Sequence, residues 1–135
     1  MAKKPISESE TEKITINLGY VDLGRVDLLV KEGFYSNRSD FIRAAIRAQI
    51  GSHDQVIQQA VARHMFVLGL QDFTRAQLEA LRKKGERLRI QVLGLARIAP
   101  DTPAELALAT IESVRVLGRL QASDAVRRAL ADRIT

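Results

Sequence analysis

One short strand-forming segment near the start of the chain limits what this sequence can fold into. Residues 13–18, KITINL, alternate polar and apolar side chains and include β-branched residues, a pattern typical of a half-buried strand. No second strand pattern follows within hairpin distance, and a lone strand with two open edges is not stable. The segment therefore requires a strand from another chain, which predicts an intermolecular sheet.

Two amphipathic helices are predicted after this strand. The first covers residues 21–32 and is closed by Gly33, which suits a left-handed cap. The second is predicted to be capped by Ser36 and closed by Gly51. A unit of fewer than about forty residues is too small to bury both helices and the strand alone, which predicts an intertwined dimer. The apolar positions are Leu23, Val26, Leu29 and Val30 in the first helix, and Phe41, Ile42, Ala45, Ile46 and Ile50 in the second.

The segments KITINL and VKEGFYSNRSDFIRAAIR, with the spacing between glycine and serine, resemble the ribbon-helix-helix superfamily of the MetJ, Arc and CopG type. The resemblance covers residues 12–50 and is strongest to the CopG-like branch. It implies that two strands form an antiparallel ribbon in the major groove of double-stranded DNA. The implied base contacts are Lys13, Thr15 and Asn17, and the implied phosphate contacts are Ser36, Asn37 and Arg38.

The side-chain chemistry of the strand fits this role. Lysine donates to guanine O6 and N7, asparagine pairs with adenine, and threonine contacts thymine. The start of a helix favours a phosphate through its exposed N–H groups and its dipole. Arg43 and Arg47, four residues apart on the second helix, are interpreted as a solvated face without base contacts. The alternating strand could also be an ordinary solvated edge, and SNRS a helix cap alone.

Two further helices are predicted in the middle of the chain. Ser52 and Gln55 form a potential capping box for a helix that ends at Gly69, and Thr74 and Gln77 form another for a helix closed by Gly85. The apolar positions of the first of these helices are Val56, Ile57, Ala60, Val61, Met65 and Leu68.

The last third alternates strand and helix patterns. Residues 87–98 and 113–121 have strand periodicity, and between them Thr102 is predicted to cap a helix with Pro103 at its first position and Glu105 completing the box. The Val-Leu-Gly triplets at 92–94 and 116–118 indicate a short βα repeat, so the two strands should be parallel. A final helix is capped by Ser123. An all-helical arrangement is the alternative, because Leu81, Leu88, Val92, Leu95 and Ala99 also fit a helical stripe.

The predicted fold class is α+β and mostly α, with an N-terminal ribbon-helix-helix followed by helices and a small βαβα module. Residues 1–11 are expected to be a flexible arm, 12–51 the DNA-binding domain, and 52–135 an oligomerisation or regulatory module. Two parallel strands are too few for a stable sheet, so this module is expected to complete itself across chains.

Several site types are not expected. There is no cysteine, and His53 and His64 are the only histidines, so we expect no metal site and no cofactor. No phosphate-binding loop or nucleophile motif indicates an enzyme, and no catalytic residue is proposed. The sequence has no apolar segment of the kind that crosses a membrane or directs secretion, which predicts a cytoplasmic, nucleoid-associated protein.

The charge distribution identifies the DNA-binding segment less specifically than the pattern of strand and helices does. The net charge is +5, and the excess lies in residues 51–99 rather than in the predicted DNA-reading segment. This middle region contains a basic cluster that could contact flanking phosphates or simply complement a helix dipole. The cluster consists of Arg82, Lys83, Lys84, Arg87 and Arg89.

The sequence thus predicts a repressor whose dimers bind operator half-sites and join through residues 52–135 into a higher homo-oligomer. Two alternatives remain. The protein could be an antitoxin, although the C-terminal segments of antitoxins are generally short and disordered before they bind a toxin. It could also be a DNA-anchored scaffold that polymerises through the βα module.

Overall fold

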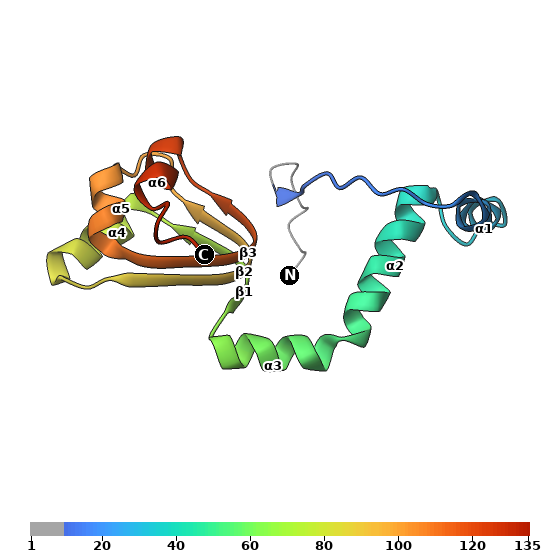
Figure 1. The fold of residues 1–135 in the computed structure, drawn as a ribbon, viewed down its shortest axis with the longest axis horizontal. Helices are drawn as coiled ribbons and strands as arrows, with labels where there is room; N and C mark the ends of the chain where they lie inside the picture. Colours follow the sequence, from blue (N-terminus) through green and yellow to red (C-terminus); the bar gives the residue numbers. More distant parts are fainter. Residues whose placement is uncertain (1–9) are drawn as a thin grey trace. The chain divides into compact units, whose positions relative to one another are not determined.

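The computed structural model describes residues 10–135, and the chain divides into two compact units, residues 1–58 and 59–135. The division falls within α3 rather than at the predicted boundary between residues 51 and 52. Residues 1–9 of the predicted arm lie outside the described residues. In chain order the elements are α1 (Tyr20–Lys31), α2 (Arg38–Ser52), α3 (Asp54–His64), β1 (Val67–Phe73), α4 (Arg75–Lys84), β2 (Leu88–Ile98), α5 (Ala104–Thr110), β3 (Ile111–Gln121) and α6 (Asp124–Ala129) (Figure 1).

The two helices predicted for the first unit are present as α1 and α2. Gly33 follows α1 with φ of 89°, and the N–H of Phe34 donates to the carbonyl of Leu29 at 3.0 Å, so the glycine ends the helix as expected. Residues 11–19 form neither helix nor strand in this single chain. Strand pairing of residues 13–18 with a second copy therefore stays a prediction.

The predicted junction between the second and third helices is wrong. Gly51 lies inside α2, and Ser52 is its last residue. The hydroxyl of Ser52 donates to the carbonyl of Gln49 at 2.6 Å, so it bonds backward to the preceding turn and does not form a capping box with Gln55. The third helix begins at Asp54 instead.

The predicted end of the third helix at Gly69 is also wrong, because α3 stops at His64 and β1 begins at Val67. Residues 67–69 form a Val-Leu-Gly triplet like those at 92–94 and 116–118, and the described part of the chain therefore contains three βα units instead of two. Local sequence favours helix in this region, but pairing of β1 along β2 overrides that preference.

The second unit is built on a three-stranded parallel sheet in the order β1-β2-β3. This confirms the predicted parallel pairing and shows that the all-helical alternative is wrong. The three triplets are aligned, so that Gly69 pairs with Gly94 and Gly94 with Gly118. Three aligned units meet the usual minimum at which repeats bury a continuous core.

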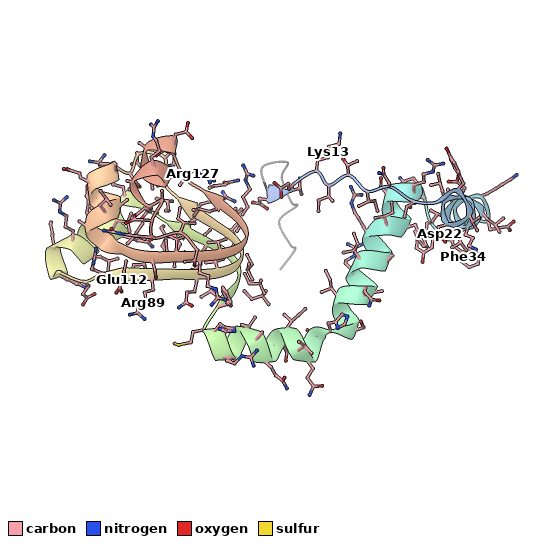
Figure 2. All side chains as sticks on the ribbon, in the orientation of Figure 1. Lys13, Asp22, Phe34, Arg89, Glu112 and Arg127 are labelled. Atoms are coloured by element: carbon pink, nitrogen blue, oxygen red, sulfur yellow. The ribbon has the colours of Figure 1, made fainter. Side chains whose placement is uncertain are left out.

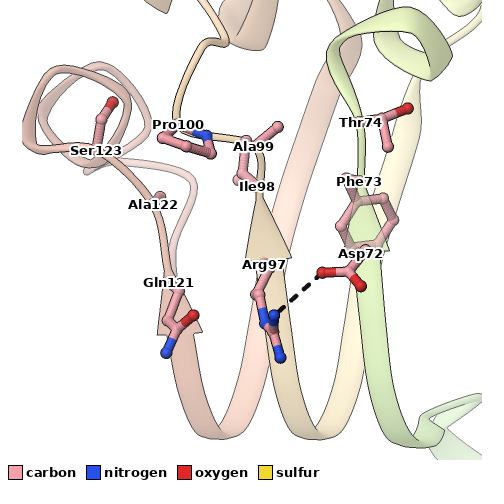
Figure 3. Close-up of a pocket in the computed structure, with 10 residues that line it drawn as sticks. All are labelled: Asp72, Phe73, Thr74, Arg97, Ile98, Ala99, Pro100, Gln121, Ala122 and Ser123. Carbon is pink, nitrogen blue, oxygen red and sulfur yellow. Dashed lines mark ion pairs between the residues drawn. The ribbon is translucent and has the colours of Figure 1, made fainter. Parts of the chain in front are cut away.

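The aligned glycines mark a bend in the strands. Gly69, Gly94 and Gly118 have φ of 121°, 138° and 117°, a backbone conformation that residues with a side chain rarely adopt. Figure 3 shows β2 and β3 turning back on themselves at the bottom of the view. A Cβ atom added to Gly94 would lie 2.2 Å from the carbonyl oxygen of Gly69, so the strands pass too closely there for any side chain.

Each strand is followed by a helix that closes the core. The capping box of Thr74 and Gln77 and the left-handed Gly85 at the ends of α4 are confirmed, as is the Ser123 cap of α6. The start predicted for α5 is wrong. Pro103 occupies the N-cap position, and Thr102 is buried without a hydrogen-bond partner for its hydroxyl.

The core of the second unit lies between the bent strands and these helices. In β2 alternate residues from Ile90 to Ile98 point inward, with the glycine at the bend, as the strand period requires. The buried core consists of Phe73, Leu78, Ile90, Val92, Ala96, Ile98, Leu106, Ala107, Ile111, Val114, Leu120, Val126 and Leu130. Within residues 10–135 no helix is long and apolar enough to cross a bilayer.

The bend gives a first test of the fold. Gly94→Ala should destabilise the second unit by about 3 kcal/mol or more, because it combines a strained φ with a clash against a neighbouring backbone. Gly69→Ala is the matched control: it has a similar φ but nothing within 4 Å of the added carbon, and should cost about 1–2 kcal/mol. Urea unfolding followed by circular dichroism measures both. Equal losses would contradict the close strand approach.

Candidate nucleic-acid interface

The turn between α1 and α2 is held by one ion pair and one aromatic contact. The guanidinium of Arg38 donates to both carboxylate oxygens of Asp27, at 2.7 and 2.8 Å, and so joins the first turn of α2 to α1. Tyr35 and Phe41 meet edge to face, with ring centroids 5.0 Å apart. These contacts fix where the second helix starts relative to the first.

The ion pair shifts the titration of both partners. The hydrogen bond from Arg38, reinforced by its positive charge, lowers the pKa of Asp27 below its ordinary value, and the same bond raises the pKa of Arg38. Because the pKa of Asp27 is lower in the folded chain, this contribution to stability is present above the ordinary aspartate pKa. It is lost as the pH falls through the lowered value.

The helix cap predicted at Ser36 lies one residue later. The Asn37 side chain accepts from the backbone N–H of Asp40 at 2.8 Å, while the Asp40 carboxylate accepts from the backbone N–H of Ser36 at 3.1 Å. The extended backbone of Asn37 places its amide oxygen over the first turn, and the Ser36 N–H is already used inside the chain.

The structure brings the three predicted phosphate-contact residues together at the start of α2. Ser36, Asn37 and Arg38 are all exposed. The first N–H groups of any helix lack intrahelical acceptors, and in α2 these are the N–H groups of Arg38 and Ser39. A negatively charged oxygen is the group that suits such donors. The Arg38 guanidinium, in contrast, is already directed to Asp27.

The predicted base-contact residues lie on the exposed segment that precedes α1. Lys13, Thr15 and Asn17 are all exposed, and Figure 2 shows the Lys13 side chain on this segment. The alternate residues Ile14, Ile16 and Leu18 are 79%, 56% and 41% exposed, so the apolar side chains of this segment are exposed together.

An apolar groove lies beside this segment. Its cavity of about 420 Å³ is bordered by both helices, and Val26 on its wall is the one buried residue among residues 10–58. Such a small buried set cannot stabilise a unit of this size by itself. The groove is lined by Ile16, Leu18, Asp22, Arg25, Val26, Leu29, Phe41, Ile42, Ala45 and Ile46.

The basic cluster of the second unit is partly used within the chain. Arg87 donates to the carbonyl of Leu108 at 3.2 Å, and Arg89 pairs with Glu112 at 3.0 Å (Figure 2). This bond lowers the pKa of Glu112 and raises that of Arg89. The remaining members of the cluster, Arg82, Lys83 and Lys84, lie in the last turn of α4, where they complement the helix dipole.

A second hollow lies where the three strands end. It has a volume of about 560 Å³, and Arg97 and Asp72 form an ion pair of 3.6 Å at its border (Figure 3). Within residues 10–135 no three potential ligands gather into a metal site. His53 lies 3.4 Å from the Gln49 amide, and His64 packs near the ring of Phe66.

A family model described as the Ribbon-Helix-Helix transcriptional regulator family matches residues 9–127. The chain belongs to this family. Ribbon-helix-helix regulators bind DNA and typically dimerise, so membership indicates a DNA-binding transcriptional regulator. The match extends beyond residues 12–50, whose motifs carried the resemblance, into the βα units. No curated protein and no solved structure matches the chain.

Sequence reasoning missed two residues of the ribbon-helix-helix unit that position the start of α2. Asp40 could have been found, because Asn37-x-x-Asp40 has capping-box spacing. Asp27 left no comparable signal, since it lies eleven residues before Arg38 on a different helix. Only the turn brings these two side chains together.

The corrected cap is testable. Asn37→Ala should destabilise the first unit by about 1 kcal/mol, because it removes the acceptor of the Asp40 N–H. Ser36→Ala is the neighbouring control and should change stability little, because the cap uses the Asn37 amide. Thermal unfolding followed by circular dichroism compares the two variants. A larger loss of stability in Ser36→Ala than in Asn37→Ala would show that Ser36 is the cap, as the sequence predicted.

Proposed function

We propose that this ribbon-helix-helix protein is a sequence-specific repressor that reads the DNA major groove with an antiparallel ribbon made from residues 13–18 of two copies. The carrying observation is that Ile14, Ile16 and Leu18 are exposed in the single chain, and that Ile16 and Leu18 line an apolar groove. A second copy of the same strand and helices is the partner that would cover both the strand edge and the groove.

The polar face of the ribbon would then determine sequence. With the isoleucines and Leu18 packed inward, alternation turns Lys13, Thr15 and Asn17 toward the base edges, where each good contact discriminates by about 1–3 kcal/mol. Two copies present these side chains twice, related by the two-fold axis, so the operator half-sites should be inverted repeats.

The start of α2 would fix the position of the ribbon on the duplex. The N–H groups of Arg38 and Ser39 there suit a phosphate, and the side chain that caps the helix, Asn37, is neutral. The contacts from Ser36, Asn37 and Arg38 would set register without carrying sequence information. The ion pair between Arg38 and Asp27 supports this positioning by joining α2 to α1.

The second unit would serve assembly rather than catalysis. It folds around its own core, unlike a segment that becomes ordered on a toxin, which favours a regulator over an antitoxin. We propose no catalytic role and no cofactor for the chain, and we place its action on the nucleoid in the cytoplasm.

The central prediction concerns the ribbon. Replacing Lys13, Thr15 and Asn17 together by alanine should weaken binding to the cognate operator by about a hundredfold or more, because three base contacts are lost from each copy. Salt-dependent binding to unrelated DNA should persist, since one lysine per copy is a small part of the phosphate contacts. Fluorescence anisotropy with cognate and scrambled duplexes, after selection of the operator from random DNA, measures both.

The double variant Arg43→Ala/Arg47→Ala is the control. It removes more positive charge per chain than the ribbon variant but should keep the ratio of cognate to scrambled affinity. If the ribbon variant retained that ratio, or if the arginine variant lost it, residues 13, 15 and 17 would not be the base readers.

A further inference from the structure

The two outer edges of the three-stranded sheet are treated differently by the chain. At β3 the C-terminal residues add a short parallel bridge between Val114 and Ile134. The N–H of Val114 donates to the carbonyl of Arg133 at 2.9 Å, and the N–H of Thr135 donates to the carbonyl of Val114 at 3.0 Å. The edge at Val114, the fourth residue of β3, is therefore occupied by the chain itself.

Two arginine side chains cover more of the same edge. Arg133 donates to the carbonyl of Ile111 at 2.8 Å, at the beginning of β3. Arg127, labelled in Figure 2, donates to the carbonyl of Leu120 near the end of β3. The carbonyl groups of Ile111, Val114 and Leu120 thus already accept hydrogen bonds, and a strand that paired along the whole of β3 would have to displace them.

The opposite edge, β1, has no such cover among residues 10–135. β1 pairs with β2 on one side, and no backbone hydrogen bond of the described residues reaches its other side. Val67, Leu68 and Leu70 are 43%, 67% and 46% exposed, and β1 contains neither lysine nor proline. An apolar edge without these protective residues normally invites another strand.

A hollow extends this open edge. β1 begins opposite Val92, so residues 88–91 of β2 have β3 on one side and no strand on the other. The space beside them measures about 350 Å³. Met65, at its border, is 77% exposed. Backbone hydrogen-bonding groups and apolar surface are thus both left open at the same end of the unit.

We infer that the β1 edge pairs antiparallel with β1 of a second copy of this chain. The inference rests on the proposed function in one respect, because a ribbon dimer holds a second copy at high local concentration. A two-fold axis makes the same strand serve as both partners, and the two three-stranded sheets become one sheet of six strands. The six-stranded sheet then has a β3 strand at each of its two outer edges.

The covered β3 edge decides against continuous polymerisation of the second unit. Growth of a filament would require β1 of one copy to add to β3 of the next. The bonds from Arg127, Arg133 and Thr135 would have to break for such an addition along the whole strand, whereas a β1–β1 contact closes after two copies. Ribbon and β1 edge would then be two separate two-fold contacts within the same pair of copies.

Cysteine crosslinking of the full chain tests the pairing, because the natural sequence has no cysteine. Leu68→Cys places a thiol on β1, and Leu117→Cys is the matched control, since both residues occupy the same register row at opposite edges of the sheet. Both side chains are more than half exposed, so the variants should fold alike. A short bis-maleimide should crosslink two copies of the Leu68→Cys protein at least tenfold more efficiently than two copies of the Leu117→Cys protein.

Equal or weaker crosslinking at position 68 would overturn the pairing. Leu70→Cys provides a second position on β1 and should behave like Leu68→Cys. Operator binding by the same variants separates the two proposals. Specific binding with no preference for the β1 thiol would contradict the β1 contact alone, whereas preferential crosslinking in a protein without sequence-specific DNA binding would contradict the proposed function alone.

Discussion

The backbone hydrogen-bonding groups of a β-strand require a partner, and this requirement governs both units of the chain. In the second unit each strand finds its neighbour in the next βα repeat, and the C-terminal residues cover β3. In the first unit residues 13–18 have strand character, and residues 10–58 of the single chain offer them no strand to pair with. The proposed ribbon and the proposed β1 contact would each supply hydrogen-bond partners to the backbone groups of an unpaired strand.

The sequence predicted those features that depend on local chemistry. The α4 capping box, Gly33 and Ser123 act within a few residues, so their roles could be assigned from spacing. The parallel pairing of β2 and β3 also followed from the repeated triplet and the helix between its copies. The candidate site residues were brought together as far as one chain allows: the base-contact residues share an exposed segment, and the phosphate-contact residues share a helix start.

The errors arose where distant contacts decide the structure. β1 carries the same Val-Leu-Gly triplet as its neighbours but follows a helical pattern without a clear stop, and only pairing along β2 makes it a strand. Thr102 has the composition of a cap, yet it is buried and the helix begins later. Asp27 positions Arg38 from eleven residues earlier in the chain, on a different helix, which no local pattern reveals. The need for glycine at the aligned positions could not be predicted for the same reason, because the close backbone approach exists only between neighbouring strands.

Hydrogen exchange at residues 13–18 tests the central claim most directly, since an intermolecular ribbon must bond these backbone N–H groups. Exchange of the full chain at micromolar concentration, followed by mass spectrometry or nuclear magnetic resonance, compares them with exposed loop amides such as those near residue 101. The account predicts that alternate amides in this segment are protected in the dimer and lose protection on dilution to the monomer. Exchange at the rate of an unstructured peptide, at every concentration, would contradict the ribbon.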